Sequence, residues 1–391
     1  MRGTVLHAGI ATVLLAGMAW AGPGDGIKAG PVVLHPFADV SVTHDSNVFQ
    51  APRDREADVY AQGAAGLRFL YSSLRFSLIG SGHAGARRYM DESDLDFDFA
   101  GQSLGAAVNG ERTALTLSQS YRRVEDIDLY GSEFAVGGIS QDSILDVASR
   151  RERDILQASL ALDRRLTDKL DLTLGGRYET VEYNDGALQD LRSAFGLVEG
   201  AFRMTPKTAL FLAGTYGQMD GKNEDGTAIG YAGRLGLKTI GTDKLVFRAG
   251  VGAQVFDPQD GGEDRTALSF DGSATWAATE KVFVQAGARN GLSKSILAAN
   301  EGVEYSVYRL GLLARASDMV TLSLSGAYRL DEYLDSDRED AGIGVRARVD
   351  FASASDALRA YWETSYENVD SNEDERDYRK LRITLGMNLK Y

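Results

Sequence analysis

Hydrophobic and polar residues alternate with a period of two along almost the whole chain after Gly22. In the C-terminal segment every odd residue from Leu381 to Tyr391 is apolar, and polar or small residues lie between them. Residues 170–178, 245–255 and 343–351 show the same alternation. Because a β-strand places successive side chains on opposite faces, each segment has one apolar and one polar face. The pattern predicts an all-β protein.

The connections between these segments are of two kinds, which alternate along the chain. Short turns centred on Asp168, Pro206, Asp243, Glu280, Asp318 and Asp356 follow one another after 38, 37, 37, 38 and 38 residues. Longer, acidic stretches such as 220–225 and 331–340 lie between them. So regular a spacing indicates a repeated hairpin.

We count 18 strands, from residues 37–43 to residues 378–391. A soluble sandwich or β-helix would also alternate, but short turns at one end and long loops at the other are typical of outer-membrane barrels. A sheet in the bilayer must also close on itself to satisfy its backbone groups. We therefore predict a transmembrane up-and-down antiparallel β-barrel with short periplasmic turns and longer acidic extracellular loops.

The N-terminus has the features of an export signal. Arg2 precedes an apolar stretch, and Ala19 and Ala21 form a small-x-small cleavage site. We expect residues 1–21 to be a cleaved signal peptide, residues 22–36 a periplasmic segment and residues 37–391 the barrel. These boundaries predict an integral protein of the bacterial outer membrane.

Aromatic residues are expected to form two girdles at the membrane interfaces. The group near the long loops comprises Tyr60, Tyr89, Tyr121, Tyr178, Tyr216, Tyr305 and Tyr366, and the group near the short turns comprises Phe69, Phe76, Phe202, Phe211, Phe247, Trp276, Phe351, Trp362 and Tyr391.

Composition removes several classes of function. The 391 residues carry a formal net charge of −14, which argues against a nucleic-acid partner, and the absence of cysteine excludes disulfides and thiolate chemistry. After the signal, His35, His44 and His83 show no nucleophile or metal-ligand spacing. We therefore expect no enzyme activity, no catalytic residue, no metal site and no cofactor.

If the apolar face meets lipid, the other face lines the lumen and is rich in cations. The candidate pore-lining residues are Arg68, Arg75, Arg177, Arg203, Arg234, Lys238, Arg248, Arg289, Arg329, Arg346, Arg348, Arg359 and Arg382. Candidate acidic partners on the same face are Asp39, Asp171, Glu179, Glu199, Asp271, Asp350 and Glu363. The cations can favour anionic solutes, or arginines and carboxylates can simply cross-link the wall.

A barrel of 18 strands is too wide for side chains alone to fill, so an aqueous channel is expected unless a loop blocks it. The longest loop, residues 125–151, is the third on the long-loop side. It could fold into the lumen and narrow the pore, as the third loop does in many general porins, or it could lie over the mouth.

The C-terminal residues Gly386, Leu389 and Tyr391 resemble the terminal signal that outer-membrane proteins present to the barrel-assembly machinery. The resemblance implies that machinery as a partner. Outer-membrane lipid and lipopolysaccharide are the other expected partners, with divalent ions bridging the acidic loops to lipopolysaccharide.

Residues 36–49, followed by Asp58 and the hairpin up to Tyr89, resemble the β-barrel porins encoded in bacterial exopolysaccharide and capsule loci. Those proteins usually carry Tyr-Asp-Asp-Asn, where this chain has His44, Asp45, Ser46 and Asn47. The resemblance implies an outer-membrane channel, and in some relatives the last step of polysaccharide export beside a periplasmic polysaccharide-export protein. By their chemistry, Asp45 and Asn47 are expected to organise the first loop by hydrogen bonding to its backbone.

Three functions remain open from the sequence. We favour a channel for hydrophilic molecules that exports an exopolysaccharide. The alternatives are a general diffusion porin for small solutes, including anionic ones, and a closed structural or adhesive barrel.

Overall fold

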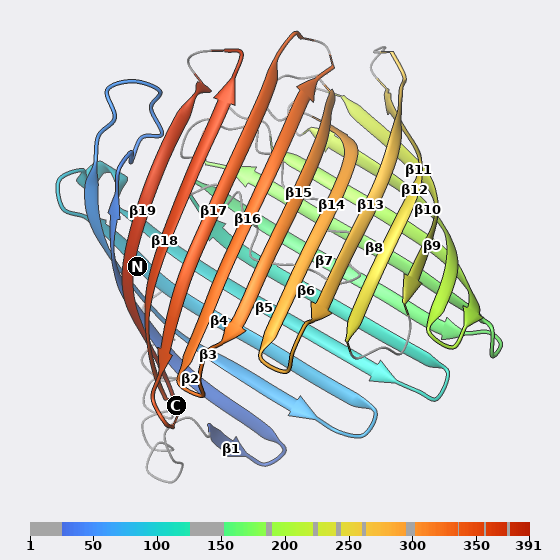
Figure 1. The fold of residues 1–391 in the computed structure, drawn as a ribbon, viewed down its shortest axis with the longest axis horizontal. Coiled ribbons are helices and arrows are strands. Elements are labelled where there is room, and N and C mark those ends of the chain that lie inside the picture. The colour runs from blue at the N-terminus through green and yellow to red at the C-terminus, as the bar shows by residue number, and fades with distance from the viewer. Residues whose placement is uncertain are drawn as a thin grey trace, which may run out of the picture.

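The computed structural model describes residues 26–125, 152–184, 190–221, 226–239, 244–259, 263–294, 302–334, 336–355, 357–373 and 376–391. Within these residues the chain forms a single antiparallel sheet rolled into a barrel (Figure 1). The short turns lie at one end and the long loops at the other, and we name the two halves of the barrel the short-turn half and the long-loop half.

The described residues form nineteen strands and one short 3₁₀ helix, η1 (Ser93–Leu95). The strands are β1 (Ile27–Ala29), β2 (Val32–Asp45), β3 (Asp58–Ser72), β4 (Phe76–Tyr89), β5 (Phe97–Asn109), β6 (Thr113–Val124), β7 (Arg153–Arg165), β8 (Leu170–Tyr183), β9 (Leu191–Thr205), β10 (Thr208–Gly221), β11 (Thr227–Thr239), β12 (Leu245–Pro258), β13 (Arg265–Ala277), β14 (Val282–Lys294), β15 (Gly302–Arg315), β16 (Val320–Tyr333), β17 (Glu339–Ala352), β18 (Leu358–Ser371) and β19 (Tyr378–Lys390).

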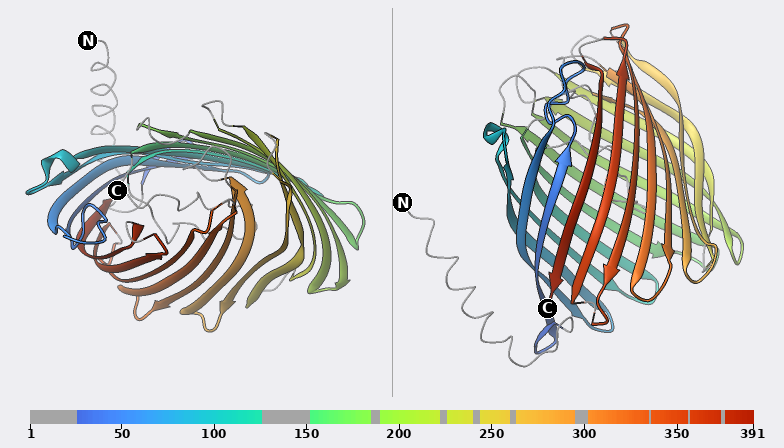
Figure 2. Two further views of the ribbon diagram at one scale, coloured as in Figure 1. Left: turned by 90° about the horizontal axis from the view of Figure 1, so that it is seen from above. Right: turned by 60° about the vertical axis from the view of Figure 1, so that its left-hand side comes forward.

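The barrel closes between its first and last long strands. From β2 to β19 each strand pairs with the next, and β19 pairs with β2 over a register that runs from Lys390 opposite Phe37 to Arg382 opposite Asp45. The prediction of a closed, 18-stranded antiparallel barrel is confirmed. Seen from above, its outline is elongated rather than circular (Figure 2, left).

The start of the sheet differs from the expectation that residues 22–36 precede the barrel. β2 begins at Val32, and its first residues pair with β3 on one side and with the short strand β1 on the other. β19 begins to pair with β2 only at Phe37. Residues 32–34 thus form a two-sided extension below the closed wall, because β1 pairs with the edge of β2 that β19 does not reach.

Several short turns repeat one local device. The side-chain oxygen of Thr167 accepts hydrogen bonds from the backbone N–H groups of Lys169 (3.2 Å) and Leu170 (3.0 Å). Ser317 does the same for Met319 (3.3 Å) and Val320 (3.1 Å). A hydroxyl that bonds its own backbone two or three residues on stabilises a tight turn. This device explains why Thr and Ser recur at the short turns of the sequence.

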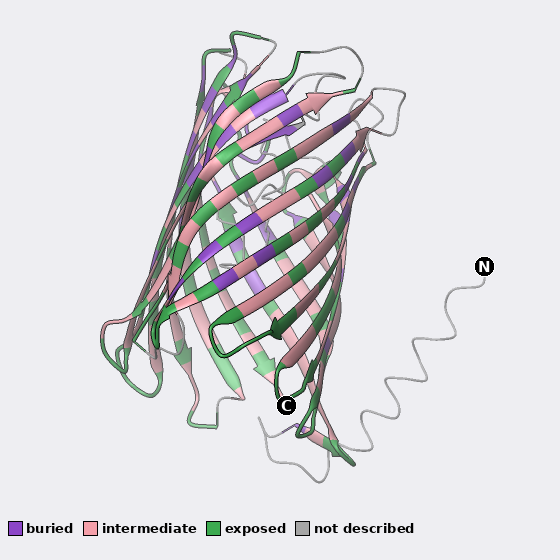
Figure 3. Ribbon diagram, turned by 90° about the vertical axis from the view of Figure 1, so that its right-hand side faces the viewer, coloured by how far each residue is buried: buried purple, intermediate pink, exposed green. Residues whose placement is uncertain are grey.

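The outer face of the barrel is apolar and exposed, as a lipid-facing surface requires. Leu212, Leu385 and Leu310 expose 66%, 62% and 60% of their surface, and the alternation of exposure along the strands is visible in Figure 3. Tyr216 and Trp276 are among the aromatic residues exposed on this face.

Four aromatic residues assigned to the girdles lie elsewhere. Tyr60, Tyr89 and Tyr305 face the interior and are buried, and Phe211 is buried in the same way on β10. The assignment was wrong for these residues because closeness to a strand end says nothing about which face a side chain occupies. That choice depends on the register of alternation.

Candidate pore interior

The strand register places twelve of the thirteen candidate cations on the face that points into the barrel. They are Arg68, Arg177, Arg203, Arg234, Lys238, Arg248, Arg289, Arg329, Arg346, Arg348, Arg359 and Arg382. Arg75 is the exception, since it lies in the turn between β3 and β4, where its carbonyl accepts a hydrogen bond from the Asn109 N–H (2.7 Å). The placement of Arg75 on the wall was therefore wrong, because the strand ends at Ser72.

Near the short turns, an ion pair joins β8 to β9. The guanidinium of Arg203 donates two hydrogen bonds to the Asp171 carboxylate, at 2.8 and 3.0 Å. Both side chains remain about a quarter exposed (27% and 22%). Arg203 therefore neutralises its partner while both groups stay in contact with water.

A denser cluster lies on the inner face of β9 to β13. Glu199 accepts hydrogen bonds or ion pairs from Lys238 Nζ (2.6 Å) and Arg248 (2.7 Å), and Arg248 also lies 3.4 Å from Asp271. The Arg248 guanidinium covers the Phe211 ring at 3.8 Å, which explains how an inward-facing phenylalanine is only 1% exposed.

A second cluster joins β17, β18 and β2. Arg348 pairs with Asp350 (2.9 Å) and Glu363 (3.4 Å), and its guanidinium lies 3.9 Å from the centre of the Tyr361 ring. The Tyr361 hydroxyl donates to Asp39 (3.4 Å) across the closing seam. Arginines and carboxylates thus cross-link neighbouring strands here as well.

The inner face of β4 to β7 has a different chemistry. Ser81 and Ser103 share a hydroxyl hydrogen bond of 2.8 Å, and Ser118 and Ser159 share one of 2.6 Å. Three of these serines, Ser103, Ser118 and Ser159, are exposed. This part of the lumen therefore offers hydroxyl groups, which both donate and accept.

The long-loop half of the interior is packed rather than open. Inward side chains on most strands are under 10% exposed there, including Thr43, Tyr60, Tyr89, Phe97, Arg153, Ile155, Glu179, Val181, Met219, Ala228, Phe256, Val303, Tyr305, Arg329, Asp331, Asp340, Glu367 and Lys380. Arg153 and Lys380 also lie at the alternate positions of their strands that face inward, but they were not among the candidate pore-lining residues. The same alternation would have identified them.

Asp45 and Asn47 lie at the long-loop end of β2 and are buried (2% and 0% exposed). The Asp45 carboxylate accepts the Asn47 N–H (3.0 Å) and pairs with the Lys380 ammonium across the seam (3.2 Å). The Asn47 amide donates to the carbonyls of Ala51 (2.8 Å) and Arg379 (3.1 Å) and accepts the Ala51 N–H (2.9 Å). The two residues hold the first loop to the closing strand.

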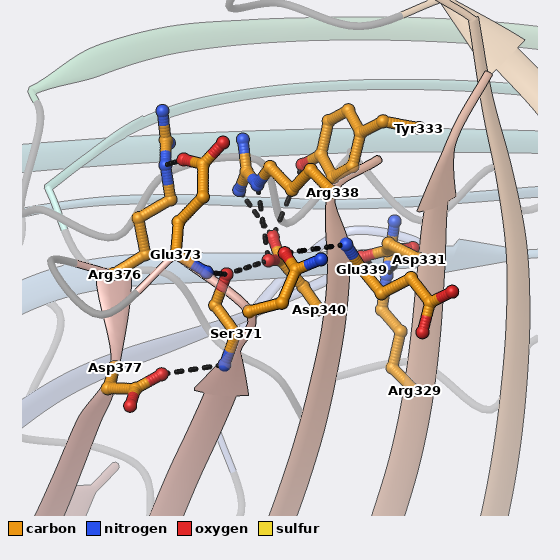
Figure 4. A network of polar contacts seen from close by, with 11 residues as sticks. Arg329, Asp331, Tyr333, Arg338, Glu339, Asp340, Ser371, Glu373, Arg376 and Asp377 are labelled. Carbon is orange, nitrogen blue, oxygen red and sulfur yellow. Dashed lines mark hydrogen bonds and ion pairs between the residues drawn. The ribbon is translucent and has the colours of Figure 1, made fainter. Parts of the chain in front are cut away.

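A buried polar network fixes the rim of β16 to β19 (Figure 4). Arg338 and the Ser371 hydroxyl (2.6 Å) both donate to the Asp340 carboxylate, and Ser371 accepts the Glu373 N–H (3.1 Å). The Arg338 guanidinium also stacks on Tyr333 at 4.0 Å. The rim of this half is therefore held by charge-assisted bonds that water reaches poorly.

The C-terminal signal residues lie on both faces of β19 and at its end. Gly386 faces inward beside the Tyr361 ring, whereas Leu389 is exposed on the outer face. The Tyr391 N–H donates to the Pro36 carbonyl (3.0 Å), and the Tyr391 carbonyl lies 3.2 Å from His35 Nδ1. The terminus is thus paired with β2, and its recognition by the assembly machinery stays a prediction.

Other expectations concern residues with little or no description. The predicted signal peptide and the third loop, apart from Glu125, lie outside the described residues. In the part of the chain that is described, no group of three or more His, Asp or Glu side chains could hold a metal ion. No helix of that part is long and apolar enough to cross a membrane.

Comparison with solved structures finds matches over almost the whole chain. The loop L8 deletion mutant of OmpT from Vibrio cholerae aligns with 12% identity and a TM-score of 0.43, over 93% of this chain and 100% of that one. OccAB4 from Acinetobacter baumannii aligns with 9% identity and a TM-score of 0.45, over 92% of this chain and 98% of that one. OpdK from Pseudomonas aeruginosa, solved with vanillate, aligns with 11% identity and a TM-score of 0.47, over 92% of this chain and 99% of that one.

A search of curated proteins found no match to this sequence. A family comparison did find one, over residues 22–391, which include the whole described barrel. The matched family is described as "Putative beta-barrel porin 2", and this chain, an integral β-barrel of the outer membrane with a porin-like channel architecture, belongs to it.

Proposed function

We propose that this protein is an outer-membrane channel for hydroxyl-rich hydrophilic molecules and that its cargo is an exported polysaccharide. The observation that carries the proposal is the composition of the lumen in the short-turn half. Arg203 and Arg348 are paired with carboxylates, and Ser103, Ser118 and Ser159 present exposed hydroxyls.

Such a wall suits a sugar chain for a physical reason. Paired charges present donors and acceptors side by side while their fields largely cancel, so a neutral, polyhydroxylated molecule can exchange hydrogen bonds along the wall. Many weak contacts of this kind allow a chain to enter without being held at one place.

A second candidate, a diffusion porin for small anions, is favoured by the wall from β9 to β14. There Arg234, Lys238, Arg248 and Arg289 face inward around the two carboxylates Glu199 and Asp271. A local excess of cations lowers the energy of an anion in the pore.

Single-channel recording in planar bilayers tests both candidates. We expect open channels whose current is blocked reversibly by long oligosaccharides, with weak ion selectivity measured from the reversal potential in a salt gradient. Strong anion selectivity without saccharide block would support the diffusion porin. Loss of surface polysaccharide on deletion of the gene in a polysaccharide-producing host would support export, and absence of current under all conditions would refute both.

A further inference from the structure

One strand pair in the barrel wall separates partway along its length. β13 and β14 pair from Ala277 opposite Phe283 to Asp271 opposite Arg289, and the ladder then stops. β13 continues to pair with β12 as far as Arg265, and β14 with β15 as far as Lys294. The two strands diverge toward the long-loop end (Figure 1).

The backbone at the point of separation is satisfied by a side chain. Asn290 Oδ1 accepts the Phe270 N–H (2.6 Å), and Asn290 Nδ2 donates to the Leu268 carbonyl (2.6 Å). The amide of Asn290, which is 6% exposed, thus replaces one step of the missing ladder. An end frayed by chance would leave these groups without such bonds, so the separation is a defined feature of the fold.

Beyond Asn290, β14 crosses into the barrel and packs on the inner wall. Leu292 is 3% exposed and forms a buried cluster with Met219 and Phe256, together with Leu191 and Ala228, all of which point inward from β9 to β12. β14 therefore contacts the inner face of β9 to β12, although β13 lies between β14 and these strands in the wall.

Polar contacts hold the same segment in place. Gln254 Nε2, from the inner face of β12, donates to the Leu292 carbonyl (2.9 Å), and the Ser293 hydroxyl lies 3.9 Å from Met219 Sδ. On β15, a Cβ at Gly302 would lie 2.7 Å from Leu334 and 3.1 Å from Phe256, so the backbone there packs closely on both side chains. The long-loop ends of β14 and β15 therefore both pack against side chains inside the barrel.

We infer that the long-loop end of the β14–β15 hairpin, residues 290–294 and 302–305, is the constriction that sets the conductance of this channel. The inference rests on the proposed function. The third loop, which the sequence suggested for this role, lies outside the described residues apart from Glu125. Within them, a folded-in piece of the wall packs on the inner face of β9 to β12, with an apolar cluster that excludes water and ions.

Removing the cluster contact tests the inference. Leu292→Gln places a polar amide inside the apolar cluster of Met219 and Phe256 and should release the hairpin from the inner wall. We expect the single-channel conductance to rise roughly twofold relative to the unmodified protein, because the apolar constriction is lost. Leu385→Gln, on the lipid-facing side of β19, is the matched control and should leave the conductance unchanged. Heat-dependent gel mobility verifies that each variant forms a barrel.

A cross-link then tests whether the hairpin itself is responsible. Because the chain has no cysteine, Met219→Cys and Ser293→Cys can be added to Leu292→Gln and joined with a short bifunctional thiol reagent. Cross-linking should return the conductance to the unmodified value. The same reagent on Leu117→Cys and Leu160→Cys, which lie opposite each other on the lipid-facing side of the paired strands β6 and β7, should have no effect.

The two hypotheses fail in different ways. If the unmodified protein conducts and Leu292→Gln conducts equally, the hairpin is not the constriction, although the protein is still a channel. If neither protein conducts, the proposed function is refuted. A higher conductance that cross-linking leaves unchanged would also overturn the assignment to the hairpin.

Discussion

The two halves of the barrel are built from the same alternating strands, but their interiors differ. In the short-turn half, Arg203 and Asp171 pair with about a quarter of each side chain exposed. In the long-loop half, Lys380 and Asp45 pair with 1% and 2% exposed. The same kind of ion pair is therefore wet in one half and fully desolvated in the other.

The difference shows that strand alternation fixes the direction of a side chain but not its surroundings. Outside the buried cluster of Ala201, Ala209, Phe211 and Ala213, the short-turn half stays in contact with water and can line a path for solutes. The packed long-loop half instead needs complete pairing of its polar groups. We therefore expect the same substitution to affect conduction in the short-turn half and stability in the long-loop half.

The largest expected contrast is between two isosteric changes. Asp45→Asn leaves the Lys380 ammonium buried without its carboxylate and should lower the free energy of unfolding by about 3–5 kcal/mol. Asp171→Asn removes the partner of a partly exposed arginine and should cost about 1 kcal/mol or less. Urea unfolding from lipid vesicles, followed by tryptophan fluorescence, measures both. An equal loss of unfolding free energy in the two variants would contradict the distinction between a packed long-loop half and a water-exposed short-turn half.

A smaller contrast concerns two serines. Ser371→Ala removes a buried hydroxyl that donates to Asp340 and accepts the Glu373 N–H, and it should cost about 1–2 kcal/mol. Ser118→Ala removes an exposed hydroxyl and should stay within about 0.5 kcal/mol of the unmodified protein. The same unfolding assay applies. A loss at Ser118 as large as that at Ser371 would show that the short-turn half is packed too.

The third comparison concerns Gly386, in the short-turn half. A Cβ there would lie 2.3 Å from the Tyr361 ring, which is a side chain beside the wet lumen. The ring can move aside, so Gly386→Ala should cost about 1 kcal/mol. Gly82→Ala, where a Cβ meets open space, is the control in the same unfolding assay. A loss of several kcal/mol at Gly386 would mean that this half of the interior is rigid.

Much of the fold could be predicted because its signals are local. The period of two defined the strands, and Thr167 and Ser317 mark turns whose hydrogen bonds form within a few residues. The parity of a charged residue also identified the inward face for all candidate cations except Arg75, which lies just beyond a strand end. These features depend on the geometry of a strand and of a turn, which sequence neighbours determine.

The packing and the exposure of side chains inside the barrel could not be predicted in the same way. Leu292 lies at one of the alternate apolar positions of β14, which in a barrel normally face lipid. In the sequence it would suit such a position as well as it suits the cluster with Met219 and Phe256. Asn290 gives no sign in the sequence that it bonds the backbone of β13. Which inward cations are wet or buried also depends on strands and loops far away along the chain.

A closed wall of alternating strands thus follows from neighbouring residues alone, because the period of two and the spacing of turns are local features. The separation of β13 from β14 beyond Asp271 and Arg289, and the inward turn of one hairpin, follow only from contacts made in the folded barrel. The physical reason is that a leucine is stabilised equally by lipid and by a protein core. The choice between the two is made by distant side chains such as Gln254 and Phe256, which meet the strand only once the barrel has closed.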